Sequence, residues 1–441
     1  MKSVSLHTLG CKLNYSETSA IAGEFSSKGF ILKNYGEASD VFVLNTCSVT
    51  ENADKECRQI VRSVIRSNPE TYVIVTGCYA QLQPEEIAGI EGVDLILGAG
   101  EKFKLFDYIH NFDKKDYSCI YRASVNEIRD FDEAFSADSD LRTRAFLKIQ
   151  DGCNYKCSFC TIPQARGSSR SLDISKVTDN AKRIIDSGYK EIVLTGVNTG
   201  DYEYKSGDVS FRLIDVMTEL DKLNIERIRI SSIEPNLLND EIIALVKSSS
   251  KFCNHFHVPM QSGDPEILKA MRRRYNNEHY RELIYKLNDE IKDVGIGADV
   301  ITGFPGETEK QFENTFEFIE SLPVSYLHVF SYSERKNTDA VMLQGKVDVR
   351  ERRRRSELLR KLSDKKRFEF YSGFTGTYQD VLFESVKNDD FTEGLTTNYI
   401  RVKVKDTDSL ENTIENVKLI STDGVKPVLA ERINVNVYSD Q

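Results

Sequence analysis

The sequence predicts an α/β protein of three parts: an N-terminal open α/β sheet domain, a central partial (βα)6 barrel and a small C-terminal β-barrel. In the first third of the chain, apolar β-branched runs alternate with amphipathic stretches, as in a parallel sheet covered by helices. Six further strand-like runs separated by helices predict the barrel. Short alternating runs predict the β-barrel. We expect the parts at residues 1–135, 140–370 and 372–441.

Composition limits the classes of function. The nine cysteines in 441 residues are too few for a disulfide scaffold, so we expect reduced thiols and a cytoplasmic location. No apolar run approaches membrane-spanning length, so we expect no membrane partner. The net charge of −10 is unfavourable for nucleic-acid binding, so any such contact must come from a local basic patch.

The first domain is predicted from four strand-like runs and three amphipathic stretches. We expect strands at residues 4–9, 41–44, 72–75 and 94–97, and helices at 16–27, 53–66 and 84–90. The charged segment 126–140 is expected to link this domain to the barrel.

Three cysteines of this domain, Cys11, Cys47 and Cys78, each lie just beyond the carboxyl end of a predicted strand. Ligands of open α/β sheets bind at that edge, so we expect the three thiols to converge. A single buried cysteine is usually a small packing residue. Three at equivalent positions instead predict a metal site, here an iron–sulfur cluster. Cys57 lies in the middle of a predicted helix and is expected to take no part.

A second group, Cys153, Cys157 and Cys160, lies in one short loop with spacings of four and three residues. No fourth cysteine or histidine is near enough in sequence to complete a tetrahedral zinc site. A four-iron cluster held by three thiolates keeps one iron open, which marks a reactive site. The alternatives are a zinc knuckle or three unconnected thiols. The neighbouring Phe159 and Pro163 favour the cluster.

The barrel is predicted from strand-like runs at residues 145–149, 191–194, 227–231, 256–258, 297–301 and 326–330. Active sites of such barrels gather at the carboxyl ends of the strands. The loops there carry the candidate cofactor-binding residues Phe159, Gly196, Asn198, Ser231, Glu234, Gln261 and Gly303. Arg166 and Arg170, just past the cysteine loop, are candidates to clamp a carboxylate or phosphate, with a surface position as the alternative. Thr308 and Gln311 predict a capping box.

Residues 346–370 form a basic segment with eleven Lys or Arg and five Asp or Glu, a local charge of +6. Arg352, Arg353, Arg354 and Arg355 occupy about one helical turn, so they project around the helix and cannot all pair with one partner. A charge run is usually a solvated face. In a chain of net negative charge, we interpret this one as an RNA-phosphate contact.

The C-terminal β-barrel is predicted from runs at residues 376–383, 399–404, 416–420 and 428–437, with Gly394 and Gly424 in turns. Arg401, Lys403 and Lys405 share one face of a strand and form a cationic strip that favours RNA binding. The domain as a whole has twelve Asp or Glu and seven Lys or Arg, and this net negative charge counts against RNA binding.

Several of these motifs resemble those of one family. Residues 8–14, 45–49 and 76–81 resemble the three signatures of the methylthiotransferase N-terminal domain. The cysteine loop, 258–263 and 303–308 resemble the family's radical S-adenosylmethionine (SAM) barrel, and the tail is similar to a TRAM domain, an RNA-binding β-barrel. The resemblance covers essentially the whole chain. Within the family, Lys12, Leu13 and Asn14 are most similar to the branch acting on N6-threonylcarbamoyladenosine in tRNA, whereas the isopentenyladenosine branch usually carries Gln-Met there.

The resemblance implies an enzyme with two 4Fe-4S clusters and SAM. The cluster on Cys153, Cys157 and Cys160 would cleave SAM to a radical that takes hydrogen from C2 of the adenine. The cluster on the other three cysteines would supply a methylated sulfur to C2. The implied substrate is the modified adenosine next to the anticodon in the tRNA anticodon stem-loop, and a reductant such as a flavodoxin or ferredoxin is the implied partner.

Three alternatives stay open. The family also contains a branch that methylthiolates an aspartate side chain in a ribosomal protein, and one that modifies isopentenyladenosine in tRNA. From a different class, the chain could be a non-catalytic iron–sulfur protein that binds RNA or transfers electrons.

Overall fold

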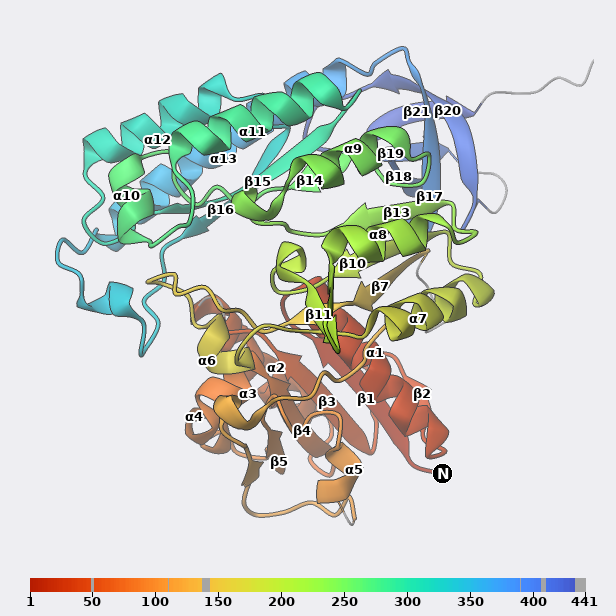
Figure 1. The fold of residues 1–441 in the computed structure, drawn as a ribbon. Helices are drawn as coiled ribbons and strands as arrows, with labels where there is room; N and C mark the ends of the chain where they lie inside the picture. Colours follow the sequence, from red (N-terminus) through yellow and green to blue (C-terminus); the bar gives the residue numbers. More distant parts are fainter. Residues whose placement is uncertain (49–50, 110, 137–142, 389, 406–409, 433–441) are drawn as a thin grey trace, which may run out of the picture.

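The computed structural model contains the three predicted parts, and the predicted fold class is confirmed (Figure 1). The structure describes residues 1–441 except 49–50, 110, 137–142, 389, 406–409 and 433–441. The N-terminal domain lies below the barrel in this view, and the C-terminal β-barrel lies against the barrel's upper part. Among the described helices, none is both long and apolar enough to cross a membrane.

The N-terminal domain is a parallel six-stranded sheet in the order β2-β1-β3-β4-β5-β6. Its strands are β1 (Ser3–Thr8), β2 (Ile31–Lys33), β3 (Val41–Thr46), β4 (Tyr72–Gly77), β5 (Leu95–Leu97) and β6 (Cys119–Tyr121). Its helices are α1 (Lys12–Ser27), α2 (Glu51–Ser67), α3 (Cys78–Leu82), α4 (Pro84–Ala88) and α5 (Leu105–Tyr108). The chain changes direction across the sheet between β1 and β3, and such a switch point is where open sheets bind ligands.

Alternate side chains of the central strands enter two separate cores. Val41 and Val43 pack on the face covered by α1, whereas Phe42 and Leu44 pack on the face covered by α2. Every residue of β3 and β4 is buried, which explains their continuous apolar sequences. The sequence missed the edge strands β2 and β6 because three exposed or half-exposed residues carry no periodic signal.

Six parallel strands form the open barrel: β7 (Arg144–Lys148), β10 (Glu191–Thr195), β13 (Arg227–Ile230), β14 (His255–His257), β15 (Gly295–Thr302) and β16 (Tyr326–Ser331). They pair as two three-stranded sheets, which a bridge between Ser232 and His257 joins. Within the described residues no strand pair joins β7 to β16, so the barrel is open on that side. Helix α1 lies along β7 there, with 6.4 Å between the rings of Tyr15 and Phe146.

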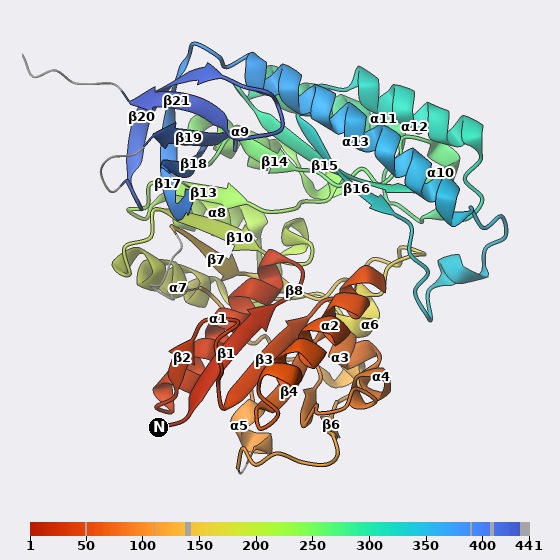
Figure 2. The same cartoon turned by 180° about the vertical axis from the view of Figure 1, so that it is seen from behind.

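Helices cover the outer face of the barrel. They are α7 (Ile174–Asp186), α8 (Leu213–Asp221), α9 (Asp240–Ser248), α10 (Pro265–Ala270), α11 (Asn277–Glu290), α12 (Glu309–Ser321) and α13 (Val349–Ser372). The short helix α6 (Ile162–Arg166) instead lies against α3 of the N-terminal domain. Thr308 and Gln311 form the predicted capping box of α12. Helix α13 carries the basic segment and crosses the back of the barrel (Figure 2).

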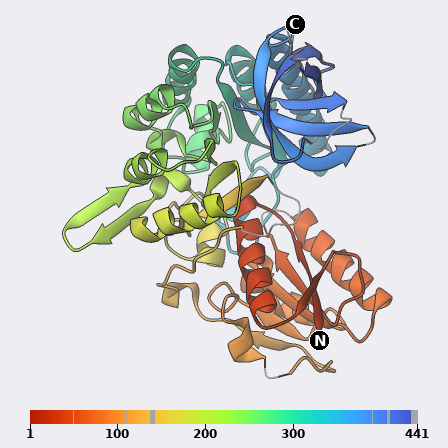
Figure 3. The same cartoon turned by 90° about the vertical axis from the view of Figure 1, so that its right-hand side faces the viewer.

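Two small β-ladders accompany the barrel. The short strands β8 (Gln150–Asp151) and β9 (Arg170–Ser171) pair on either side of the cysteine loop. A hairpin of β11 (Glu203–Ser206) and β12 (Val209–Arg212), which the sequence analysis did not predict, projects from the barrel (Figure 3).

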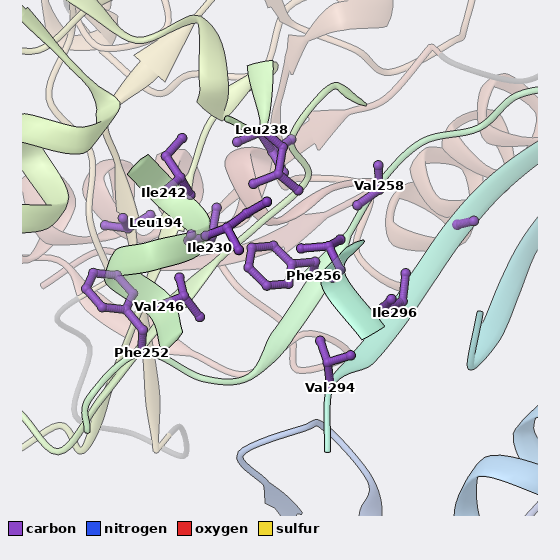
Figure 4. Close-up of a cluster of buried hydrophobic side chains, with 14 of the residues drawn as sticks. Leu194, Ile230, Leu238, Ile242, Val246, Phe252, Phe256, Val258, Val294 and Ile296 are labelled. Atoms are coloured by element: carbon purple, nitrogen blue, oxygen red, sulfur yellow. The ribbon is translucent and has the colours of Figure 1, made fainter. Parts of the chain in front are cut away.

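The apolar core of the barrel lies between strands and helices, outside the sheet. Leu194, Ile230 and Phe256 pack against Ile242 and Val246 of α9 (Figure 4). The alternate strand positions, which face the lumen, are instead largely polar or charged: Arg144, Glu191, Arg229, His255, His257, Asp299 and His328. Because a closed (βα)8 barrel fills this space with branched apolar side chains, the polar lumen marks a site rather than a core.

The C-terminal part is a closed barrel in the order β17-β18-β19-β21-β20. Its strands are β17 (Tyr378–Asn388), β18 (Phe391–Thr396), β19 (Arg401–Lys405), β20 (Ile414–Ser421) and β21 (Val428–Arg432); residues 433–437 of the last predicted strand lie outside the described residues. The turn predicted at Gly394 is wrong. This glycine lies within β18, where a Cβ would come within 2.6 Å of the carbonyl oxygen of Leu382.

The C-terminal barrel closes the amino-terminal end of the (βα)6 barrel. Arg227, the first residue of β13, donates to the carbonyl oxygens of Leu395 and Asp380 at 2.8 and 2.7 Å. The ring of Tyr399 enters between Arg229, 4.0 Å away, and His255, 4.8 Å away. The C-terminal barrel is therefore a floor under the lumen, opposite the end from which the cysteine loop emerges.

Candidate functional site

The cysteine loop, which runs from Cys153 to Cys160, is pinned at its start by two glycines with φ near +70°. A Cβ on Gly152 (φ +69°) would lie 2.0 Å from the carbonyl oxygen of Ser168, so only glycine fits that approach. The amide of Cys153 donates to the carbonyl oxygen of Gly167 at 3.1 Å. The start of the loop is thereby held against the segment that follows α6.

Backbone and side-chain donors point at the three sulfurs. The amides of Tyr155 and Ile162 lie 3.4 and 3.5 Å from the sulfurs of Cys153 and Cys160. The guanidinium of Arg273 donates to Cys157 Sγ at 3.1 Å. Donors of this kind stabilise thiolates and tune iron–sulfur clusters.

Burial raises the pKa of Cys153 to about 11 and that of Cys160 to about 12. Neutral thiols are thus favoured until a cation binds, as expected for ligands that release protons on metal binding. Neither triad gathers its donor atoms within 4.8 Å; among the described residues, only His257, Asp299 and His328 do so.

Arg273 is a residue that the sequence analysis missed. It lies between Cys157 and Glu234, forming an ion pair with the latter, so it ties a predicted cofactor-binding residue to the cysteine loop. The available signal was a run of three arginines, residues 272–274, in an acidic chain.

A cavity of about 200 Å³ lies beside the cysteine loop. Its lining includes the predicted residues Phe159 and Gln261, together with Cys160, Ile301 and Tyr332. The Tyr332 hydroxyl is buried and has no hydrogen-bond partner in the described protein. The cavity thus combines apolar walls with an unpaired polar atom, the usual character of a small-molecule site.

The other predicted cofactor residues are placed differently. Asn198 is 4% exposed, and both its amide oxygen and its amide nitrogen have no partner in the described protein, so it is available to a ligand. Ser231 bonds to Thr199 at 2.9 Å. A Cβ on Gly196 would lie 2.9 Å from Gln150. A Cβ on Gly303 would lie 2.3 Å from Arg352, so this glycine serves packing of α13.

The cysteines of the N-terminal domain follow three adjacent strands, β1, β3 and β4. A Cβ on Gly10 would lie 2.9 Å from Cys47 Sγ, and a Cβ on Gly77 would lie 2.4 Å from the carbonyl oxygen of Thr46. The side chain of Asn14 donates to the carbonyl oxygens of Leu9 and Thr46 at 2.8 and 3.0 Å. The loops that carry Cys11, Cys47 and Cys78 therefore meet at one edge, as predicted.

Cys57 lies in the core between α2 and the sheet. Cys57 is fully buried, and burial raises its pKa to about 12. It packs among apolar side chains, whereas the sequence predicted only that it takes no part in the metal site.

A buried ion network joins the two cysteine triads. Its carboxylates are Glu17 of α1 and Asp151 of β8, and its cations are Lys102, Lys148 and Arg166, all at most 6% exposed. Arg166 lies 2.8 Å from Glu17 and 3.0 Å from Asp151, and Lys102 lies 2.5 Å from Glu17. Burial by itself raises the pKa of Glu17, but Arg166, Lys102 and Lys148 hold it well below its usual range.

This network changes the interpretation of Arg166 and Arg170. Arg166 also donates to Asn14 at 2.5 Å, so it connects the loop after Cys160 to the helix after Cys11. Arg170 lies 3.3 Å from Asp151. Both guanidinium groups are already paired with a buried carboxylate, so the structure does not leave them open to clamp a ligand.

The basic segment of α13 also differs from the expectation of four projecting arginines. Arg352 is 3% exposed and pairs with Glu334 at 2.7 Å; Arg355 is 4% exposed and pairs with Glu307 at 2.8 Å. The expected phosphate contact is therefore wrong for Arg352 and Arg355. Their guanidinium groups are buried in ion pairs and do not reach a phosphate. Arg353 is exposed, and Arg354 is exposed beside Glu351 and Glu309. On β19, Arg401, Lys403 and Lys405 point outward, as predicted.

The polar lumen has two layers of charged and aromatic side chains that the sequence analysis missed. One lies between the cavity and the C-terminal barrel, and the other lies next to that barrel. Asp299 lies 3.0 Å from His257 and 3.3 Å from His328 in the middle layer. Below it, Arg229 lies 3.3 Å from His255. The signal was present as charged residues alternating with apolar ones within strands, as in residues 227–230 and 255–257.

Comparisons with known proteins agree with these features. The family described as "Radical SAM superfamily" matches residues 147–319, and "Uncharacterized protein family UPF0004" matches residues 3–98. The chain is 39% identical to "Threonylcarbamoyladenosine tRNA methylthiotransferase MtaB" from Bacillus subtilis over 95% of this chain and 94% of that protein. It is 32% identical to "tRNA-2-methylthio-N(6)-dimethylallyladenosine synthase" from Endomicrobium trichonymphae, over 98% and 96%.

Among solved structures, the radical S-adenosylmethionine methyltransferase TsrM from Kitasatospora setae aligns with a TM-score of 0.51 at 14% identity, over 75% of this chain and 73% of that one. At this identity the likeness concerns the fold alone.

Replacing Glu17 with Gln tests the ion network. The variant should lose about 3–5 kcal/mol of unfolding free energy at pH 7, because it leaves three buried cations with one carboxylate. A depressed carboxyl pKa stabilises the fold above the unfolded value of about 4.3 and ceases to do so as pH falls through the folded value. The difference between wild type and Glu17→Gln should therefore shrink below about pH 4 in urea titrations. The exposed control Glu70→Gln should change little; a constant difference from pH 7 to pH 3 would contradict this account.

Proposed function

The chain belongs to the methylthiotransferase family of radical SAM enzymes, and from this we propose that it converts N6-threonylcarbamoyladenosine next to the anticodon of tRNA to its 2-methylthio derivative. The relative named for that substrate has higher identity than the dimethylallyl relative, 39% against 32%. A cytoplasmic location suits a tRNA substrate.

The observation that carries the proposal is that two cysteine triads lie on either side of one buried interface and are joined by it. Arg166, which follows the loop of Cys160, bonds to Asn14, which follows Cys11. On the other flank, Arg335 of the barrel lies 2.7 Å from Asp54, and it also contacts Ser48, next to Cys47. Methylthiolation needs two reactive centres held in fixed relation, and this interface supports that requirement.

Both triads fit the group that the family implies. Cys153, Cys157 and Cys160 would hold a 4Fe-4S cluster with an open iron, and the N-terminal triad would hold the second. Such clusters supply reductive cleavage of SAM and delivery of sulfur, which side chains alone do not. The protein's own part is to bind SAM beside Phe159 and Gln261 and to exclude water from the lumen.

Orientation of the cofactor falls to residues with unpaired polar atoms. Asn198 has an amide without a partner in the described protein, and Tyr332 a hydroxyl. Arg273 bonds Cys157 and Glu234 together, so it fixes the loop relative to the strand end at Glu234. We assign these residues to holding SAM and the cysteine loop.

The experiment that tests the function is mass spectrometry of tRNA nucleosides. Cells lacking the gene should accumulate N6-threonylcarbamoyladenosine and lose its 2-methylthio derivative, and the purified enzyme should restore it on a stem-loop. Loss of the methylthio derivative of isopentenyladenosine would overturn the substrate, and modification only of a ribosomal protein would favour the protein-directed branch.

Iron content tests the two triads separately. Replacing Cys153, Cys157 and Cys160 with Ala should remove about half the iron and abolish SAM cleavage. The corresponding triple variant of the N-terminal domain should remove the other half and spare SAM cleavage. Cys57→Ala is the control and should keep all the iron. Full iron content without the N-terminal triad would refute the second cluster.

RNA contact is proposed for the exposed cations Arg353, Arg401 and Lys405, and for the half-buried Lys403 between the last two. Arg353→Gln and the triple β19 variant should weaken stem-loop binding and lower the salt slope by about one for each phosphate that is no longer neutralised, measured by fluorescence anisotropy at several salt concentrations. Arg355→Gln should instead lower thermal stability, because Glu307 stays buried without its partner. An unchanged salt slope in both surface variants would contradict the RNA contact and show that these cations only face solvent.

A further inference from the structure

We propose that the floor of the barrel lumen is a carboxylate-binding pocket, in which Lys12 and Arg229 bind the carboxylate of the threonylcarbamoyl arm. This inference rests on the proposed function and names the side chains that distinguish the charged arm from an apolar one.

Arg229 is a buried cation without a carboxylate. It is 4% exposed, and its guanidinium stacks on the Tyr399 ring at 4.0 Å and bonds to His255 Nδ1 at 3.3 Å. Within the described residues it makes no ion pair. Burial, and then Arg229 itself, hold the pKa of His255 well below its usual range, so this imidazole is a neutral acceptor and no counter-ion. A buried guanidinium in this state favours an incoming anion.

Lys12 reaches the same floor from the N-terminal domain. Helix α1 runs beside β7, with Glu17 level with Lys148 at 3.3 Å and Tyr15 level with Phe146. The amino group of Lys12, the first residue of α1, lies within electrostatic reach of Arg229, Arg144 and Glu191. Lys12 is partly exposed and makes no ion pair with any described residue. It stands beside Cys11, so the pocket adjoins the N-terminal cysteine triad.

The charges of the floor do not balance. Arg144, Arg227 and Arg229 are three cations, and the two carboxylates, Glu384 and Glu191, leave a net charge of +1 before Lys12 is counted. Burial, Arg229 and Arg144 lower the pKa of Lys12 well below its usual range. Glu384 pairs with Arg144, and Glu191 accepts the Tyr399 hydroxyl.

This excess stands in a lumen closed below by the C-terminal barrel, where repulsion between cations is poorly screened. A carboxylate bound between Lys12 and Arg229 relieves it. By contrast, Arg166 and Arg170 are already matched by Asp151.

The layers of the lumen suit a modified adenine. Along β15, Gly297 at the floor and Ile301 at the cavity are about 13 Å apart, at about 3.3 Å per residue. An arm held at the floor places the base in the layer of His257, Asp299 and His328, below the cysteine loop. An isopentenyl arm would leave the two cations unpaired, and sites with unpaired polar groups reject such analogues strongly.

The test is binding of anticodon stem-loops to the anaerobically reconstituted enzyme by fluorescence anisotropy. The probes carry N6-threonylcarbamoyladenosine, its neutral methyl ester, or plain adenosine. Wild type should bind the acid about 10- to 100-fold tighter than the ester, as expected for a charge-assisted contact. In Lys12→Gln this ratio should fall close to one, and Lys12→Arg should keep most of it. Lys28→Gln, at the exposed far end of the same helix, should match wild type.

The outcomes distinguish a failure of the pocket from a failure of the proposed function on which it rests. If wild type forms the methylthio product on the acid stem-loop but binds acid and ester equally, the pocket is refuted and the function stands. An equal loss on all three probes in Lys12→Gln would make Lys12 a phosphate contact and also refute the pocket. If wild type forms no product on the acid stem-loop, the proposed function itself fails.

Discussion

A buried ion network between two domains is the interaction on which the site depends. Glu17 and Asp151 are surrounded by Lys102, Lys148 and Arg166, and none of these side chains has more than slight contact with water. Removing one member leaves a buried charge unmatched, so the network permits one relative placement of the domains and penalises others. Arg166 ends the short helix after the cysteine loop, and Glu17 lies in the second turn of the helix after Cys11. The same contacts that hold the domains together thereby hold the two cysteine triads at a fixed separation.

The barrel complements this arrangement by inverting the usual distribution of apolar residues. Its outward strand positions form the main core with the helices, whereas its inward positions are charged or aromatic. The open side admits α1, and the C-terminal barrel closes the floor with Tyr399, whose φ of +67° is rare for a non-glycine residue. Surrounding contacts must hold such a strained backbone in place, and strained residues of this kind cluster at functional sites. The lumen is thus walled by all three parts of the chain, and no part contains the site alone.

The strands and helices with strong periodicity were predictable, and the short or exposed elements were not. Residues 41–44 and 72–75 mark strands because they are buried on both faces, whereas β2 and β6 are edge strands of three residues. Gly394 illustrates a different failure: glycine usually marks a turn, but here it permits close approach of two strands inside a barrel. The four arginines of α13 were correctly placed on a helix, yet two of them face inward toward Glu334 and Glu307. Helical spacing gives the direction in which each side chain leaves the helix. It does not tell which residues of the rest of the protein lie in that direction.

The sequence by itself determined which cysteines are the candidate ligands and where in the fold they lie. The spacing of Cys153, Cys157 and Cys160 is local, and the positions of Cys11, Cys47 and Cys78 follow from the rule that parallel strands end at one edge. Only the tertiary structure decided how charges are used, because pairing depends on residues far apart in the chain. Arg166, 149 positions from Glu17, became part of an interdomain network. Lys12 and Arg229 were brought to one floor, where no carboxylate of the described residues pairs with either. A sequence does not tell whether a charged side chain is paired with an opposite charge. Its burial and its distance from other charged groups decide this.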